Sequence, residues 1–260
     1  MSSSFVYKSL FLVPILAVVA MQLSFVQSVL SLNQTNEYLH HLCLNRQGTY
    51  ESGSKYARDL NNLIQMISIS ILGDVVVFSG DNSIYVKLQC RGDSSTSTCR
   101  SCLDTAFSGV SRRCLNNKGR IIWYDNCVLT ISNISYVWRD RLPEQFLYFN
   151  AKDVSGDAKS FNEKTRTLLY KLKEKASSKE NIPNKKNYLY ATGEESLGKM
   201  KLYAMVQCTQ DLSIKNCNVC LNWILGKLPK CCNDKQGGRF LSTSCNFRYE
   251  LYLFVKLTTI

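Results

Sequence analysis

The 260-residue sequence is poor in the residues and motifs on which catalysis and cofactor binding depend. It contains only two histidines, His40 and His41, and four prolines. It contains no Gly-rich phosphate loop, no His-Glu-x-x-His zinc motif and no Ser nucleophile elbow. We therefore expect no enzymatic activity, no cofactor and no metal site.

Long disordered stretches and a C-terminal membrane span are not expected either. Hydrophobic residues make up 45% of the chain and charged residues 20%, with 13 glycines, which is typical of folded domains. Residues 249–260 alternate in polarity and include Glu250 and Lys256, so they predict a last strand and a tail. We expect no transmembrane anchor there.

The longest apolar run lies at the N-terminus, from Leu10 to Leu23, after Lys8 and before several small residues. A basic start, an apolar stretch and small residues form the pattern of a secretory signal peptide. A retained signal anchor is the alternative, but Pro14 within the run argues against it. We expect a signal peptide over residues 1–32, cleaved near 28–32, and a secreted, extracellular chain.

The formal net charge of +12 raises the question of an anionic partner. The alternative is a solvated basic surface without a specific ligand. The densest basic run, residues 171–186, also contains Glu174 and Glu180, so the positive charge is spread out. We expect no nucleic-acid partner.

Against these absences stand 12 cysteines, and ten of them repeat. Cys90, Cys99 and Cys102 form a C-x8-C-x2-C pattern that returns 118 residues later, from Cys208 (90 to 208). The same offset relates Cys114 to Cys232 and Cys127 to Cys245. Two homologous domains follow, over residues 33–136 and 142–253, joined by a short linker near 138–144.

In a secreted protein these cysteines are expected to form disulfides rather than zinc or redox sites. The eight-residue interval is also not a usual zinc-ribbon spacing. Two glycosylation sequons, at Asn33 and Asn133, fit surface positions on a secreted chain.

Hydrophobic periodicity predicts the same order of elements in both repeats. For the first repeat we predict helices over 54–71 and 99–113 and strands over 75–79, 84–90, 121–124 and 127–131. For the second repeat we predict helices over 161–172 and 220–228 and strands over 188–190, 202–208, 240–241 and 246–254.

Two C-x8-C-x2-C repeats behind a signal peptide resemble the plant cysteine-rich repeat secretory proteins. Their unit is the ginkbilobin-2-homologous domain, also called domain of unknown function 26. Residues 121–125 before Cys127, and 237–240 with 245–250, support the resemblance. The resemblance implies an α+β fold, with a five-stranded antiparallel sheet in each domain and two helices on one face.

The resemblance also implies how the cysteines pair. In the first domain the implied bridges are Cys43–Cys114, Cys90–Cys99 and Cys102–Cys127, and in the second they are Cys208–Cys217 and Cys220–Cys245.

The second domain departs from the family pattern at Cys231 and Cys232. The offset places Phe161 where Cys43 would map, and Cys231 is surplus. Cys231 and Cys232 are left unassigned: they could form a vicinal bridge, stay free, or cross-link to a second chain. Asn116-Asn117-Lys118 even aligns better with residues 233–235 if Cys231 is the equivalent of Cys114.

A single-domain relative resembles a lectin that binds mannose through an asparagine, an arginine and a glutamate. Position by position, the resemblance implies Arg239 and Glu250 in the second domain, with the asparagine near Asn150. Several fixed polar partners suit the vicinal hydroxyls of a sugar. The alternative is that Arg239 and Glu250 form a cross-strand ion pair.

In the first domain the same positions hold Leu44, Ile121 and Ser132. These side chains cannot replace the trio, although Arg120 lies one residue from its slot. We therefore expect no mannose site of this kind in the first domain.

An integrin-type tripeptide and a cysteine near two histidines both have structural explanations. Arg91-Gly-Asp93 spells an integrin-type tripeptide, but a tight loop inside the cysteine motif explains it without adhesion. A Cys–His nucleophile pair needs a free thiol and an orienting group, and Cys43, near His40 and His41, is expected to be bridged.

The sequence thus predicts a secreted, tandem-domain binding protein of the plant apoplast, with carbohydrate recognition of the mannose type. A basic antimicrobial or defence protein acting on anionic cell surfaces is the alternative. The expected partners are cell-wall or microbial glycans, or extracellular domains of related proteins.

Overall fold

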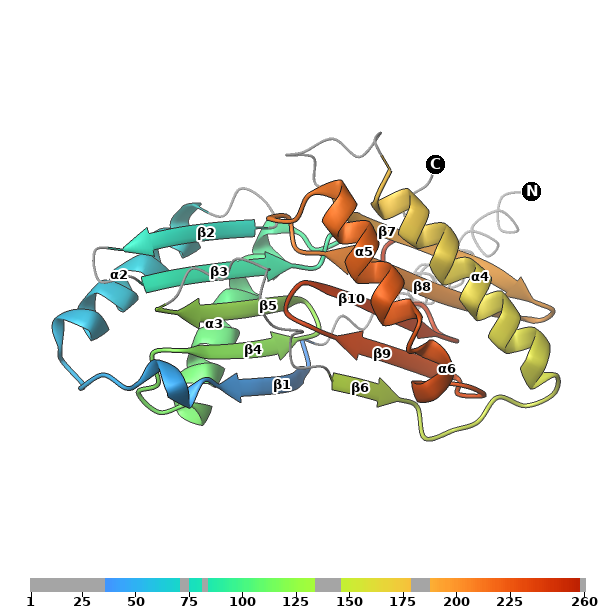
Figure 1. Ribbon diagram of the computed structural model, residues 1–260, viewed down its shortest axis with the longest axis horizontal. Helices are drawn as coiled ribbons and strands as arrows, with labels where there is room; N and C mark the ends of the chain where they lie inside the picture. The colour runs from blue at the N-terminus through green and yellow to red at the C-terminus, as the bar shows by residue number, and fades with distance from the viewer. Residues whose placement is uncertain (1–35, 71–74, 81–83, 134–145, 179–187, 258–260) are drawn as a thin grey trace, which may run out of the picture. The chain divides into compact units, whose positions relative to one another are not determined.

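The fold was obtained as a computed structural model that describes residues 36–70, 75–80, 84–133, 146–178 and 188–257. The predicted signal peptide, the sequon at Asn33 and the linker near 138–144 lie outside the described residues. Residues Thr35–Ile260 form one compact unit. Within it, each repeat builds one five-stranded sheet (Figure 1).

The first sheet has the strand order β1-β4-β5-β3-β2 and is antiparallel throughout. The elements of this domain are β1 (Tyr38–Cys43), the 3-10 turn η1 (Asn45–Gln47), α2 (Lys55–Ser70), β2 (Val75–Gly80), β3 (Ile84–Cys90), α3 (Thr96–Arg113), β4 (Arg120–Tyr124) and β5 (Cys127–Ser132).

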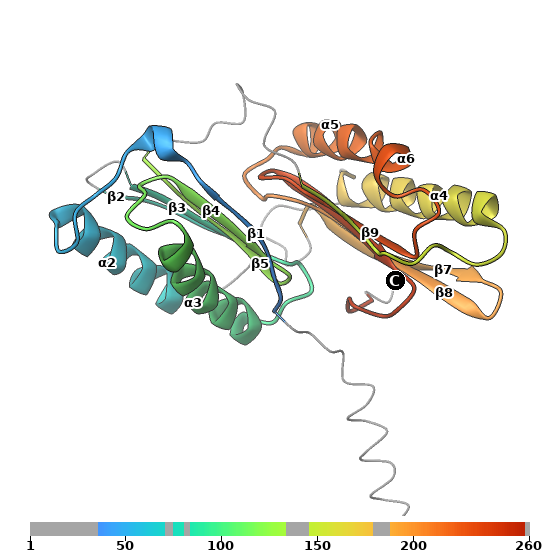
Figure 2. The same ribbon diagram turned by 90° about the horizontal axis from the view of Figure 1, so that it is seen from below.

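The second sheet repeats this topology with the order β6-β9-β10-β8-β7. Its elements are β6 (Phe146–Phe149), α4 (Ala158–Ala176), β7 (Tyr190–Leu197), β8 (Met200–Cys208), α5 (Ile214–Leu225), α6 (Leu228–Cys231), β9 (Gly237–Leu241) and β10 (Cys245–Glu250). In both domains the helices cover one face of the sheet, as Figure 2 shows. The predicted α+β fold, with two long helices on one face of each sheet, is confirmed.

The two long N-terminal helices bury side chains at identical spacing, which is why each lies flat on its sheet. In α2 the buried residues are Tyr56, Leu60, Leu63, Ile64 and Ile67. In α4 the residues at the same spacing are Phe161, Thr165, Leu168, Leu169 and Leu172. One position differs in kind, because Thr165 stands where the first domain has Leu60.

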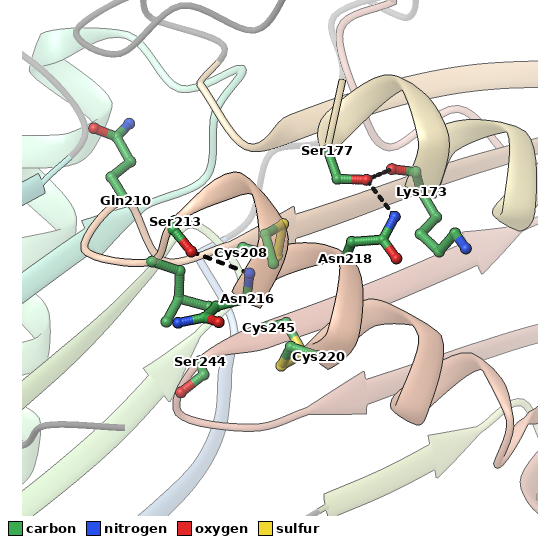
Figure 3. Close-up of a disulfide and its surroundings, with 12 residues drawn as sticks. Lys173, Ser177, Cys208, Gln210, Ser213, Asn216, Asn218, Cys220, Ser244 and Cys245 are labelled. Carbon is green, nitrogen blue, oxygen red and sulfur yellow. Dashed lines mark hydrogen bonds between the residues drawn. A yellow bond between two sulfur atoms is a disulfide. The ribbon is translucent and has the colours of Figure 1, made fainter. Parts of the chain in front are cut away.

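The second helix of each domain starts at a serine cap that the periodicity did not locate. The Ser95 hydroxyl accepts from the Thr98 amide. In the second domain the Ser213 hydroxyl accepts from the Asn216 amide, as Figure 3 shows. Such caps satisfy amides that the first turn leaves unpaired. Both helices therefore begin earlier than predicted, at Thr96 and Ile214.

The disulfides tie these helices to the strands beneath them. The bridges are Cys43–Cys114, Cys90–Cys99, Cys102–Cys127, Cys208–Cys217 and Cys220–Cys245, which is the pairing that the family resemblance implies. Figure 3 shows Cys208 and the Cys220–Cys245 bridge beside α5. The remaining two cysteines, Cys231 and Cys232, form a vicinal bridge at the end of α6.

Several predicted boundaries in the second domain are wrong. The predicted strand over 188–190 is mostly a turn, and β7 runs from Tyr190 to Leu197 through a polar stretch without apolar alternation. The last strand ends at Glu250, not at 254, because Phe254 and Val255 pack in an irregular segment against Tyr190. The helix predicted over 220–228 is replaced by α5 and the short α6.

The edge strands β1 and β6 were not predicted, because they are short and do not alternate in polarity. They also locate the missing cysteine of the second domain. Cys43 pairs with Arg120 across β1 and β4, and at the equivalent place in β6 and β9 Phe149 pairs with Gly238. The counterpart of Cys43 is thus Phe149, not Phe161, and the residue after it is Asn150.

Candidate functional site

The strand register brings the predicted trio together at β9 and β10. Gly237 lies opposite Glu250, and Arg239 lies opposite Arg248 two residues along the same face. The Asn150 amide donates to the carbonyl of Gly237 at 2.9 Å. Phe240 and Phe247 point to the helices instead, so Arg239 and Glu250 lie on the face away from the helices.

The Arg239 side chain is engaged by the first domain rather than by Glu250. Its Nη2 lies 2.6 Å from Oδ1 of Asp125, and Nη1 of Arg248 lies 2.9 Å from the same oxygen. Nη1 of Arg91 contacts the other carboxylate oxygen of Asp125 at 3.2 Å. One carboxylate therefore joins three guanidinium groups from both domains.

Glu250 completes this group through Arg248, whose Nε donates to Oε1 of Glu250 at 3.0 Å. The alternative interpretation, an ion pair between Arg239 and Glu250, is therefore wrong. Arg239 pairs with Asp125, and Glu250 pairs with Arg248. Asn150 uses its Oδ1 to accept from the Lys152 amide at 2.9 Å. We call the six side chains Arg91, Asp93, Asp125, Arg239, Arg248 and Glu250 the interdomain ionic cluster.

Burial and charge shape the titration of this cluster. Burial alone would raise the pKa of Asp125, but Arg239, Arg248 and Arg91 outweigh it and hold that pKa below its ordinary value. Burial raises the pKa of Glu250, and Arg248 and Arg239 only partly offset the effect. Asp125 is therefore the fixed anion of the cluster.

The Arg91-Gly-Asp93 tripeptide is part of the cluster and is not presented to solvent. Nε and Nη2 of Arg91 donate to the two carboxylate oxygens of Asp93 at 2.6 and 3.2 Å. Both side chains are no more than 3% exposed. Nη2 of Arg91 also donates to the Phe254 carbonyl, so the motif fastens the C-terminal segment.

Apolar and hydrogen-bonding contacts surround the cluster. Ile121, Trp123 and Leu241 form a buried group with side chains of both domains. Nε1 of Trp123 donates to the Ser242 carbonyl at 3.2 Å, and Nε2 of Gln207 donates to the Cys90 carbonyl at 2.8 Å. The two domains therefore share a buried interface.

The two histidines of β1 contact aromatic side chains and a disulfide. Nδ1 of His40 lies 3.0 Å from the Tyr148 hydroxyl, and the His40 ring stacks on Phe146. His41 lies near Cys43 and Cys114, the only grouping of metal-ligand type among the described residues. Both thiols are consumed in one disulfide, which leaves His41 without metal-binding partners.

Asn133 follows β5, and its side-chain Nδ2 donates to the Gln47 carbonyl at 3.2 Å. Its backbone amide donates to Oε1 of the same glutamine. A glycan on Asn133 would be attached to a side-chain amide that is hydrogen-bonded to Gln47 of η1.

Sequence reasoning missed Asp125, Arg91 and Arg248 as partners of Arg239. Asp125 lies between the two predicted strands 121–124 and 127–131, where Asp-Asn usually forms a turn. Comparison of the two repeats could have drawn attention to Asp125, because the residue at the equivalent position of the second domain is Thr243. A charge present in one copy alone points to a role that the copies do not share.

Within the described ranges, no helix has both the length and the apolar character needed to cross a membrane.

Comparison with known proteins gives a consistent result. The family model described as "Salt stress response/antifungal" matches residues 42–134 and 150–252. "Putative cysteine-rich repeat secretory protein 21" of Arabidopsis thaliana is 60% identical over 258 residues, which cover 98% of this chain and 99% of that protein. "Cysteine-rich repeat secretory protein 29" of the same plant is 48% identical and covers 94% and 97% of the two chains.

Two solved structures share the fold. The tandem DUF26 ectodomain of the Arabidopsis thaliana cysteine-rich receptor-like protein PDLP8 superposes with a TM-score of 0.69 at 17% identity. That of PDLP5 superposes with a TM-score of 0.68 at 22% identity. Each match covers 84% of this chain and 100% of the ectodomain.

Proposed function

The chain belongs to the family of cysteine-rich repeat secretory proteins, and on that premise we propose that it is an extracellular carbohydrate-binding module. Its relatives are named secretory proteins, and the chain is a secreted plant protein with the tandem DUF26 fold. The proposed ligands are neutral glycans of cell walls or microbes, with mannose as the expected sugar.

The observation that carries the proposal is the asymmetry of the two sheets. It is supported by the register, which puts Arg239 and Glu250 on one face of the second sheet, and by the backbone amide of Asn150, which donates to the Gly237 carbonyl beside them. The same positions in the first domain hold Leu44, Ile121 and Ser132. Fixed amide, guanidinium and carboxylate groups are the partners that vicinal hydroxyls require.

On this proposal Asp125 competes with the sugar for Arg239, because its carboxylate already accepts from that guanidinium. Sugar binding then depends on an exchange of partners at the domain interface.

Retention on a mannan column tests the proposal with three variants. We expect Arg239→Ala to abolish retention and Asp125→Asn to increase it. Arg112→Ala, at an exposed arginine of α3, is the matched control and should elute like the wild type. Equal retention of all four proteins, with thermal melts showing that each is folded, would contradict the proposal.

A defence function on anionic surfaces is the second candidate. The matching family model is described as "Salt stress response/antifungal", and the net charge is +12. Binding driven by charge weakens steeply with ionic strength, whereas hydroxyl recognition does not. Loss of glycan or cell binding between about 50 and 500 mM salt would favour this second function.

A further inference from the structure

The second domain contains a pocket of about 400 Å³ on the helix side of its sheet, away from the interdomain ionic cluster. One wall is the face of α4, and the other is formed by the end of α6, the loop after it and Tyr249 of β10. Volumes of roughly 300–1,000 Å³ are typical of small-molecule sites. The polar residues that line it are Lys159, Asn162, Glu163, Thr165, Arg166, Asn233 and Asp234.

The pocket is preformed, because its two walls are fastened to each other. Nδ2 of Asn162 donates to Oδ1 of Asp234 at 2.7 Å, and the Asp234 amide donates back to Oδ1 of Asn162 at 3.0 Å. The Tyr249 hydroxyl donates to the Cys232 carbonyl at 2.8 Å. A ligand would therefore not have to order the pocket when it binds.

Thr165 gives the pocket an unanswered hydrogen-bonding group. The residue is 2% exposed, and its hydroxyl has no hydrogen-bond partner in the part of the chain that the structure describes. Burying a hydroxyl without a hydrogen-bond partner is unfavourable. The hydroxyl oxygen is itself closed off from solvent, so a ligand hydroxyl would meet it after the Thr165 side chain turns toward the pocket, and that contact would remove this cost.

The rim carries charges of both signs that the protein leaves unused. Lys159, Glu163 and Arg166 are exposed, and within the described ranges they form no ion pair or hydrogen bond. With Asp234 the rim holds two cations and two anions. A phosphate would meet Glu163 and Asp234, and an amine would meet Lys159 and Arg166, so a neutral ligand with both donors and acceptors fits best.

The first domain carries larger side chains at two equivalent positions. Leu60 stands where the second domain has Thr165, and Arg120 stands where it has Gly238. The Arg120 guanidinium reaches the Cys114 carbonyl and the Tyr50 hydroxyl. In the second domain the Tyr249 hydroxyl takes over the contact to the equivalent carbonyl, and the Tyr249 ring and Cys232 pack against Gly238, where the first domain has the Arg120 side chain.

We propose that this pocket, named here the α4–α6 pocket, binds a neutral polyhydroxylated small molecule or sugar unit, with Thr165 at its inner end and the Lys159, Glu163 and Arg166 side chains at its rim. The site is separate from Asn150, Arg239 and Glu250. The pocket would give a carbohydrate a second place of contact on the second domain. Only the identity of its natural ligand rests on the proposed function.

Titration of the full chain with methyl α-mannoside and with sorbitol, followed by NMR of labelled threonine methyl groups, tests the proposal. The Thr165 methyl signal should shift with saturation. Thr165→Leu, which introduces the residue of the first domain, and Thr165→Val should weaken binding about tenfold. Thr167→Val, at an exposed threonine of the same helix, should bind like the wild type.

The outcomes separate this proposal from the mannan experiment. Binding of the small probes that is about tenfold weaker in Thr165→Leu and unchanged in Arg239→Ala supports the α4–α6 pocket, even if mannan is not retained. Mannan retention that needs only Arg239, with no probe shifting Thr165, overturns the pocket and leaves the proposed function intact. Preferential binding of inorganic phosphate or putrescine overturns the neutral ligand class.

Discussion

The two domains share a frame but not a chemistry. Both have the same strand order, the same serine-capped helix and two bridges that span the same sequence separations of 9 and 25 residues. The differences lie at Leu60 and Thr165, and at Arg120 and Gly238. The first domain buries a leucine and an arginine at these positions, whereas the second has a threonine beside a polar pocket and packs Tyr249 and Cys232 against its glycine. The strands, caps and bridges that determine the fold are therefore alike in the two domains, whereas the side chains around the proposed pocket differ.

The largest expected effect concerns the third bridge of each domain. Cys43–Cys114 closes a loop with a sequence separation of 71, so replacing both cysteines by alanine should cost about 4 kcal/mol of unfolding free energy. Cys231–Cys232 closes no chain loop, and its double serine variant should cost well under half of that. Denaturant unfolding measures both, and equal losses would contradict the comparison.

The interdomain ionic cluster should be next in size. Asp125→Ala leaves three guanidinium groups without their shared anion, and breaking a buried ion pair costs about 3–5 kcal/mol. Thr243→Ala, at the equivalent position of the second domain, is the control and should change stability little. A Tm for Asp125→Ala within the error of that control would show that the cluster does not hold the domains together.

The cluster also predicts a pH dependence. The pKa of Asp125 is lowered in the folded protein, so its contribution is fully present above the ordinary value of 3.8 and is lost as the pH falls through the folded pKa. Glu250, whose pKa is raised, acts in the opposite sense. The stability difference between the wild type and Asp125→Asn should shrink below pH 3.8. A difference that stays constant from pH 6 to pH 2 would contradict the assignment.

Exchange of the core position sharpens the comparison further. Leu60→Thr should lower the unfolding free energy by about 2 kcal/mol, because it removes packing and buries a hydroxyl. Thr165→Val should raise it by about 1 kcal/mol, because it removes a hydroxyl without a partner. The test is whether the two variants change the unfolding free energy in opposite directions. A loss of stability in Thr165→Val would show that the Thr165 hydroxyl has a hydrogen-bond partner.

The smallest effects are expected at the two helix caps, where the domains should behave alike. Ser95→Ala and Ser213→Ala each remove one cap and should each cost about 1 kcal/mol. A clear difference between the two variants in denaturant unfolding would show that the duplicated frames are not energetically equivalent.

The sequence predicted most of the fold because repetition and periodicity are local signals. The cysteine offset located both domains, and the spacing from Tyr56 to Ile67 and from Phe161 to Leu172 located the two N-terminal helices. The edge strands β1 and β6 escaped because an edge strand needs only one paired neighbour and no alternating face. Their pairing depends on β4 and β9, which are distant in the chain.

The candidate sites were less predictable because they depend on contacts between domains and on space. Asp125 looks like any turn residue until the fold brings Arg239 and Arg248 to it. Thr165 fits the apolar spacing of its helix, and only the missing hydrogen bond distinguishes it from a core residue. Alignment with Leu60 of the first domain was the one signal in the sequence that could have drawn attention to it.

The most direct test of the central claim is a glycan array probed with the full chain at low and high salt. Recognition of hydroxyl groups by the second domain predicts a small set of neutral glycans, bound with similar signal at about 50 and 500 mM salt. Signal confined to anionic glycans and lost at high salt, or no signal for any neutral glycan, would contradict the account.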